Sequence, residues 1–433
     1  MKNKFMKHVL TAIFLTALLF VFASCSGDKK AAETQAEVPA EEETTIASEP
    51  AAEEETEDED NYVNFDEYDD DDDYDEDEEE ETGENEKNDL EEPTTKAPAG
   101  SGNPYPYEPA REYYSYLTGI KCTRKQQKKR PVSIIINNIK VAMPTVGISH
   151  ADIIYECMVE GGITRLMAVV SNYDDVPVFG SVRSSREYFI DLSRTHDTIY
   201  VHAGGNPQDY DQFDIRPIER MDGVNMHFPN TFYRDQVRRR TMAMEHTLMT
   251  SGAGIIKGIE ERKYRTTYNS DYKGAFNFYK RFTSIGGTNN TANYICVPFS
   301  NGVKPEFLFN PDDKLYYRKQ YGAAHIDGET GEQLRFENVI VLFAEYTPFR
   351  GNAIAIREGH WKCDLTGSGY GFYITNGKYK IIKWQKETRE SIMYLYNMDN
   401  SKLYLNPGKS FVCVTSTAYN KSVVINSDLK DIG

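Results

Sequence analysis

The residues best suited to chemistry in this sequence lie between Asp152 and Gly205, where charged side chains interrupt an apolar frame. Those that we single out are Glu156, Glu160, Arg165, Arg183, Arg186, His202, Gly204 and Gly205. Arginine presents a planar fork of donors that matches phosphate or carboxylate groups. Glutamate and histidine are the side chains that most often transfer protons in enzymes. These types therefore indicate either an anion-binding site or an acid–base centre.

Two predicted strands position the first of these residues. The apolar runs 153–159 and 163–170 are separated by a turn signal with two glycines, so they predict adjacent strands. Glu156, Glu160 and Arg165 then fall within these strands or at their ends.

A predicted helix positions the next residues. Ser184 precedes Glu187 by three residues, the spacing of a capping box, and the pattern predicts a helix through Asp197. Because a helix N-terminus favours anions, the flanking Arg183 and Arg186 strengthen the expectation of an anion site.

A third group of residues belongs to further strand ends. The run 198–201 predicts a strand that ends at His202 and two glycines, a position where open α/β sheets bind ligands. The run 131–138 predicts a buried strand, whose Asn137 is expected near the same cluster. His246 follows within 235–249, which has a helical pattern, and is a further candidate ligand contact.

The same residues are compatible with a purely structural role. The three arginines can pair with Glu156, Glu160 and Asp191, and His202 can be a hydrogen-bonded histidine at a strand end. Ion-pair networks of this kind also produce dense charge clusters. Both interpretations remain open at the level of the sequence.

The N-terminus has the features of an export signal. Basic residues precede an apolar run, 9–23, and small residues precede Cys25, which predicts a signal peptide over residues 1–24. The run is shorter than the ~20 apolar residues that span a bilayer. The Cys position resembles a bacterial lipobox, although Phe22 stands where Leu is usual. The resemblance implies lipidation at Cys25 and an extracytoplasmic protein anchored to the bacterial cell membrane.

Charge is distributed very unevenly along the chain. Residues 26–99 contain 33 acidic and 4 basic residues, whereas residues 100–433 contain 35 acidic and 42 basic residues. The first region predicts a disordered acidic tether, 25–99, that spaces the body from the membrane. Binding of calcium or a cationic peptide by the runs 69–73 and 75–81 is the alternative, but no EF-hand pattern accompanies them.

Cysteine spacing and charge limit the expected partners. Five cysteines remain after Cys25, with no CxxC pair, so neither a disulfide framework nor a zinc site is predicted. We expect no metal, no cofactor and no nucleic acid. The basic cluster 121–130 is interpreted as a solvated link, with contact to an anionic envelope polymer as the alternative.

The pattern after the tether predicts an α+β protein with two domains. A linker, 100–130, leads to a mixed α/β domain, 131–290, which is followed by a mainly antiparallel β domain, 291–425. Asn376-Gly377 is a strong hairpin signal in the second domain. The strands predicted there are 294–297, 307–309, 315–321, 338–346, 370–375, 379–384, 391–396, 402–405 and 410–415.

Several segments together resemble the YerB-like bacterial lipoproteins. They are PVSIIINN (131–138), GISHADIIYECMVEGGITRLMAVV (147–170), GSVRSSREYFIDL (180–192), VHAGG (201–205) and MEHTLMTSG (244–252), with shorter matches at 317–318, 338–341, 383–386 and 405–408. The resemblance covers about residues 130–420. It implies an exported, lipid-anchored protein with paired N- and C-terminal domains, and it supplies no activity. Glu245 stands where the family tends to have Pro.

Three functions fit these features. The first is binding of a phosphate- or carboxylate-bearing envelope component, such as a cell-wall polymer or peptide, by the Arg/Glu/His cluster. The second is an envelope glycan or phosphodiester hydrolase or transferase, with Glu160 and His202 as catalytic groups and arginines that stabilise the developing anion. The third is a scaffold for other envelope proteins. No nucleophile elbow or Ser/His/Asp order supports the second.

Overall fold

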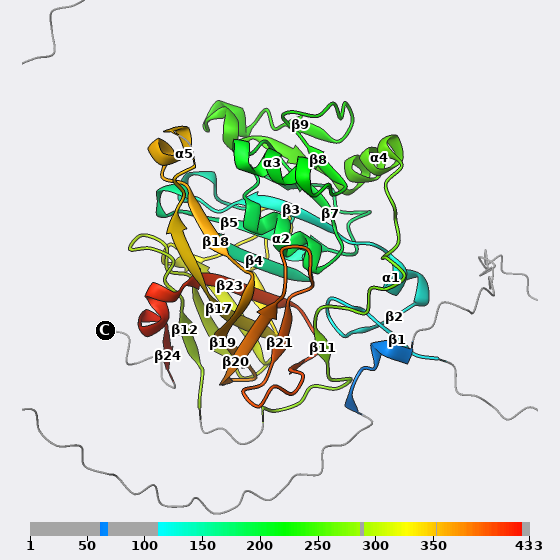
Figure 1. Cartoon of the computed structure of the whole chain (residues 1–433), viewed down its shortest axis with the longest axis vertical. Helices are drawn as coiled ribbons and strands as arrows, with labels where there is room; N and C mark the ends of the chain where they lie inside the picture. Colours follow the sequence, from blue (N-terminus) through cyan, green and yellow to red (C-terminus); the bar gives the residue numbers. More distant parts are fainter. Residues whose placement is uncertain (1–60, 68–110, 286–289, 352, 427–433) are drawn as a thin grey trace, which may run out of the picture. The chain divides into compact units, whose positions relative to one another are not determined.

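The structure, a computed structural model, describes residues 61–67, 111–285, 290–351 and 353–426. The predicted signal peptide, Cys25 and most of the predicted tether lie outside these residues. The described part is built around a mixed sheet of eleven strands, in the order β21-β20-β19-β17-β23-β4-β5-β3-β7-β8, with β18 paired to β17 (Figure 1). Together with its separate helices, this sheet confirms the predicted α+β class.

A strand from near the end of the chain lies at the centre of this sheet. β23 (Ser410–Ser416) pairs in parallel with both β4 (Ile153–Met158) and β17 (Asn338–Pro348). All of its residues are buried, as expected for a strand covered on both faces. The other strands are β3 (Val132–Asn137), β5 (Thr164–Val170), β7 (Ile199–His202), β8 (Arg220–Asp222), β18 (Trp361–Asp364), β19 (Gly367–Thr375), β20 (Lys378–Lys386) and β21 (Tyr394–Tyr396).

Smaller sheets surround the large one. A six-stranded sheet is formed by β12 (Tyr294–Cys296), β13 (Glu306–Asn310), β14 (Leu315–Gln320), β15 (Ala323–Ala324), β16 (Arg335–Phe336) and β24 (Val424–Asn426). A three-stranded sheet is formed by β6 (Phe179–Gly180), β9 (Phe232–Arg234) and β10 (Leu248–Thr250). The two-stranded sheets are β1 (Tyr113–Tyr114) with β2 (Lys121–Cys122), and β11 (Asn277–Phe278) with β22 (Tyr404–Leu405).

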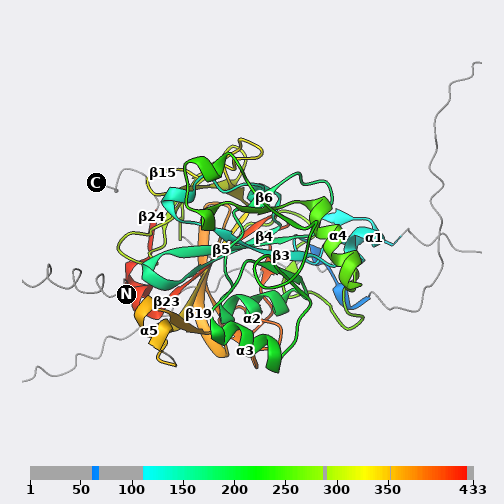
Figure 2. The ribbon, with the colours of Figure 1, turned by 90° about the horizontal axis from the view of Figure 1, so that it is seen from above.

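The helices are short and lie outside the sheets. They are α1 (Arg124–Lys128), α2 (Glu187–Thr195), α3 (Pro207–Ile215), α4 (Gly252–Arg262) and α5 (Ala353–Glu358). Figure 2 shows α2 and α3 side by side on one side of β3, β4 and β5, with β6 on the other side. β1, β2 and α1 fall within residues 100–130, for which the sequence pattern predicts a linker.

One predicted helix is confirmed as α2, with a different N-cap, and a second helix prediction is wrong. The N-cap of α2 is Arg186, not Ser184, whose carbonyl instead accepts a hydrogen bond from Nη1 of Arg165 at 3.0 Å. Residues 235–249 contain the 3₁₀ turns η6 (Arg238–Arg240) and η7 (Met244–His246) and then enter β10. The apolar residues of β10 pair with β6 and β9, so tertiary pairing overrides the helical spacing.

The hairpin prediction is confirmed. Asn376 and Gly377 join β19 to β20 with positive φ angles of 51° and 70°, the type I′ geometry that matches the twist of paired strands. The predicted strands 153–159 and 163–170 also pair, as β4 and β5, around the 3₁₀ turn η5 (Glu160–Gly162).

Candidate functional site

The turn between β4 and β5 brings together three of the predicted site residues. Oε1 of Glu160 accepts a hydrogen bond from Nη2 of Arg165 at 2.6 Å. Its other carboxylate oxygen accepts from Nε of Arg186 at 3.0 Å and from Nη2 at 2.6 Å. The predicted cluster therefore exists, but both of its guanidiniums are buried and share the carboxylate of Glu160.

The triad of Glu160 with Arg165 and Arg186 holds the carboxylate in its ionised form. Although burial alone raises it, the charges of the two arginines bring the pKa of Glu160 down to about 2. A carboxylic acid with so low a pKa carries no proton near neutrality, so this geometry does not favour Glu160 as a general acid.

Arg183 and His246 form a second part of the same region. Nη1 of Arg183 donates to the carbonyl of Glu245 at 2.8 Å, and the Glu245 carboxylate lies 3.6 Å from Nη2 of Arg183. The ring of His246 lies 3.0 Å from the side-chain nitrogen of Asn137. The structure therefore brings these predicted residues together, each with a partner already in place.

His202 is buried at the end of β7. Its Nδ1 donates to the carbonyl of Gly204 at 2.8 Å, and its ring stacks on Phe213 at a centroid distance of 5.3 Å. Burial lowers the pKa of His202 to about 4, so the ring is neutral. Gly205 allows the close approach of Asp209, because an added Cβ would lie 2.8 Å from its carboxylate. These contacts give His202 and Gly205 a packing role.

Glu156 is separated from the other predicted residues. It is fully buried and accepts hydrogen bonds from Asn138 at 2.9 Å, Thr164 at 2.7 Å and Nη2 of Arg318 at 2.7 Å. A side chain enclosed in this way has no route to a ligand from solvent.

A pocket of about 360 Å³ lies elsewhere and shares no lining residue with the predicted cluster. Its basic residues are Arg111, Arg124, Lys128 and Lys273, its aromatic residues are Tyr113, Tyr116, Tyr268 and Tyr272, and the others are Gln127, Thr267, Asn269 and Ser270. None of the described residues that line it is acidic. Because charge of a single sign in a concave site attracts the opposite charge, this pocket has the character of an anion site.

Packed tyrosines form one wall of the pocket. Tyr268 stacks on Tyr272 at 4.6 Å between ring centroids, and Tyr116 meets both rings edge-on at 5.3 and 5.5 Å. Burial raises the pKa of Tyr268 and of Tyr272 well above the usual range. Both phenols therefore stay neutral and do not offset the cationic side chains.

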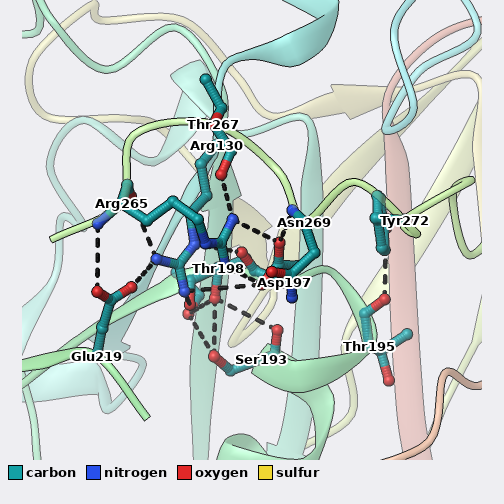
Figure 3. Close-up of polar contacts among 11 residues, drawn as sticks. Arg130, Ser193, Thr195, Asp197, Thr198, Glu219, Arg265, Thr267, Asn269 and Tyr272 are labelled. Carbon is teal, nitrogen blue, oxygen red and sulfur yellow. Dashed lines mark hydrogen bonds and ion pairs between the residues drawn. The ribbon is translucent and has the colours of Figure 1, made fainter. Parts of the chain in front are cut away.

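A partly buried ion-pair network holds this wall in place (Figure 3). Asp197 accepts two hydrogen bonds from the Arg265 guanidinium, at 2.6 and 2.9 Å, and one from the backbone N–H of Asn269 at 2.8 Å. Arg130 contacts Glu219, which also accepts from the N–H of Arg265 at 3.2 Å. These contacts tie the loop between α4 and β11 to residues beside α2 and β8.

Helix α1 also lines the pocket, and its Lys128 carbonyl accepts a hydrogen bond from the N–H of Tyr268 at 3.0 Å. Thr123 and Gln126 form a reciprocal capping box at its N-terminus, and Nε2 of Gln127 donates to the carbonyl of Tyr114 at 2.9 Å. Arg124 and Lys128 lie four residues apart and so share a face of the helix, an arrangement that costs a helix about 0.2–0.5 kcal/mol for like charges. Within the described part of the chain, neither side chain has a hydrogen bond or ion pair.

The sequence did not predict this pocket, and only three of its lining residues lie in the basic cluster, which was interpreted as a solvated link. The basic cluster 121–130 was the available signal, and contact with an anionic polymer was its alternative interpretation. Tyr268 and Tyr272 come from a distant loop without a motif, so nothing local marks them as pocket residues.

Two further observations concern the described residues. No group of three or more His, Cys, Asp or Glu side chains among them is arranged to hold a metal ion. None of their helices combines the length and the apolarity needed to cross a membrane.

Comparisons with known proteins place the chain in a family. Residues 117–265 match the family model described as "Protein of unknown function (DUF3048) N-terminal domain", and residues 295–412 match the corresponding C-terminal domain. The chain is 29% identical over 311 residues to the "Putative lipoprotein YerB" of Bacillus subtilis (strain 168), which covers 70% of this chain and 86% of that protein.

A solved structure agrees with this relationship. The crystal structure of the YerB protein from Bacillus subtilis matches with a TM-score of 0.61 and 25% identity, over 72% of this chain and 99% of that one. The chain belongs to the YerB-like family, whose members pair these N- and C-terminal domains.

Proposed function

We propose that this protein is a lipid-anchored envelope protein that binds a phosphate- or carboxylate-bearing envelope component in the pocket between α1 and the loop before β11. The similar Bacillus subtilis protein is named as a lipoprotein, and this chain begins with the sequence features of a lipoprotein signal. The protein is extracytoplasmic and held at the bacterial cell membrane, and lipidation at Cys25 is the proposed attachment.

One observation carries the binding proposal. Arg111, Arg124, Lys128 and Lys273 line a formed pocket without an acidic residue among its described lining. Arginine and lysine together supply bidentate and point-charge contacts to phosphate or carboxylate groups. The tyrosine wall adds flat aromatic surface, which suits a ligand with an organic body.

The cluster around Glu160 stays a predicted site, and its geometry is less suited to an added ligand. The donors of Arg165 and Arg186 already bind Glu160 and the carbonyls of Ser184 and Ser185. An external anion would have to displace Glu160 and leave two buried guanidiniums without it. The enzyme alternative gains no support, because a carboxylate with a pKa of about 2 is a weak base with no proton to donate near neutrality, and His202 is fully buried.

Calorimetric titration of the intact chain in detergent tests the proposal. The probes are inorganic tripolyphosphate and triglutamate, which separate phosphate from carboxylate recognition. We expect binding that weakens with salt, as for contacts between exposed charges, and that falls at least about tenfold in Arg124→Gln/Lys128→Gln, a loss of about 1.4 kcal/mol.

Two matched variants locate the site. Lys125→Gln removes a charge from the same helix outside the pocket and should retain most of the affinity. Arg183→Ala removes the most exposed arginine of the predicted cluster, whose side chain is 15% exposed. Binding that survives Arg124→Gln/Lys128→Gln but is lost in Arg183→Ala would show that the anion binds at the predicted cluster around Glu160 instead. No binding of either probe, in the intact chain or in the variant with a neutral 69–81 segment described below, would refute anion binding.

A further inference from the structure

A short piece of the acidic N-terminal region is docked on the folded body. Residues 61–67 lie beside β11 and β22: the N–H of Val63 donates to the carbonyl of Phe278 at 2.9 Å, and Tyr62 and Tyr279 form an antiparallel bridge. These are the contacts of a peptide that adds to the edge of a small sheet.

Apolar side chains hold this segment in place. Val63 and Phe65 are 4% and 5% exposed, and the ring of Tyr62 lies 4.3 Å from that of Tyr404. The ring of Phe65 packs on Tyr116 at 4.8 Å between centroids. Tyr116 is itself a wall of the cationic pocket, so the docked segment ends beside that pocket.

The sequence that follows is the most acidic part of the chain. From 69 to 81, every residue except Tyr74 is an aspartate or glutamate. The described chain resumes at Arg111, which is a lining residue of the pocket. Residues 68–110 are thus joined at both ends to residues at or next to the pocket.

We propose that the acidic segment 69–81 is an intramolecular ligand of the cationic pocket and competes there with the external anion. The docked residues 61–67 hold one end nearby, which for a short link gives an effective concentration in the millimolar range. Its carboxylates meet Arg111, Arg124, Lys128 and Lys273, and this attraction is screened by salt. Competition with an external anion rests on the proposed function. Occupancy of the pocket by segment 69–81 does not.

Zero-length cross-linking of the intact chain tests occupancy without any external ligand. A water-soluble carbodiimide activates a carboxylate, which then forms an amide with a lysine amine as the carbodiimide leaves as its urea. We expect peptides that join 69–81 to Lys128 or Lys273, at a yield several-fold above that for Lys125, which is on the same helix but outside the pocket. Equal yields at Lys125 and Lys128, or no cross-link to either pocket lysine, would refute the proposal.

Competition is measured with two variants of equal charge. One replaces the twelve acidic residues of 69–81 by Asn or Gln, and the control replaces the twelve acidic residues of 37–60 in the same way. We expect the first to bind tripolyphosphate at least about tenfold more tightly than the intact chain, and the control to change little by comparison. Equal affinities for intact chain and both variants would refute the inference and leave the proposed function standing. If neither the intact chain nor either variant bound tripolyphosphate, the proposed function would be refuted. The cross-linking result would then show by itself whether segment 69–81 occupies the pocket.

Discussion

Arg318 of β14 donates a hydrogen bond to Glu156 of β4 across 2.7 Å, and both side chains are fully buried. The guanidinium also contacts His325, and its carbon lies 4.9 Å from the centroid of the Phe411 ring. Burial and the neighbouring arginine lower the pKa of His325 well below its usual range, so the ring stays neutral and accepts the hydrogen bond. This pair links strands from the two halves of the sequence.

Glu156→Gln is expected to destabilise the fold strongly. It leaves the Arg318 charge buried without its counter-charge, which costs about 3–5 kcal/mol in comparable pairs. The double variant Glu156→Gln/Arg318→Met should recover part of the loss, because no unpaired charge remains. Urea unfolding measures both. A single-variant cost below about 1 kcal/mol would show that the pair contributes little.

Glu160→Gln is expected to show a pH-dependent cost. The pKa of Glu160 falls from 4.5 to about 2 on folding, so the folded form gains stability above pH 4.5 and loses it as pH falls towards 2. The variant should therefore lose on the order of 2–3 kcal/mol at pH 7 and much less at pH 2.5, measured by urea unfolding. Glu332→Gln, from an exposed pair with Arg335, is the control and should change stability by less than about 1 kcal/mol.

Asp197→Asn is expected to loosen the tyrosine wall of the pocket. Asparagine keeps the shape and tolerates the positive φ of 48° at this position, but it loses the charge that holds Arg265. We expect a cost of about 1.5–3 kcal/mol, faster hydrogen exchange at residues 267–269, and weaker tripolyphosphate binding. Asp174→Asn, which removes a more exposed partner of Lys129, should leave exchange in that loop unchanged.

Asp209→Asn is expected to stabilise the protein at alkaline pH. Its Oδ1 has no hydrogen-bond partner among the described residues, and burial, against the charge of Arg186, raises its pKa from 3.8 to about 7. The folded state then prefers the protonated acid, so stability falls as pH rises from about 4 through 7. The stability of the variant relative to the native chain should grow by on the order of 2 kcal/mol between pH 5 and pH 8. A constant difference across this range would contradict the raised pKa.

Local sequence signals predicted much of the secondary structure. The alternation and turn residues that define β19 and β20 are sufficient for a hairpin, because asparagine and glycine accept the positive φ angles that the turn requires. Helix patterns were less reliable, since 248–250 pairs with two strands that no local signal identifies. The parallel pairing of β23 with β4 joins distant parts of the chain, and no sequence pattern in either segment predicts it.

In the candidate site, too, local signals predicted some contacts and missed those between distant segments. The proximity of Glu160 and Arg165 follows from one predicted hairpin, and the structure brings them into contact. Glu156 pairs instead with Arg318, which is 162 residues away in the sequence. No local pattern therefore indicated that Glu156 would lie apart from the predicted cluster. The cationic pocket likewise needs three segments, 111–116, 124–128 and 267–273, and only the basic residues of the second form a recognisable local pattern.

The place of β23 has a consequence for biogenesis. A chain that crosses a membrane N-terminus first delivers β4 and β17 before the strand that separates them. Until β23 arrives, both present an unpaired edge and the middle of the sheet is open, so the sheet is completed only after residues 410–416 have crossed. Premature termination before residue 410 would leave those two inner edges permanently unpaired, which makes such products targets for aggregation and proteolysis.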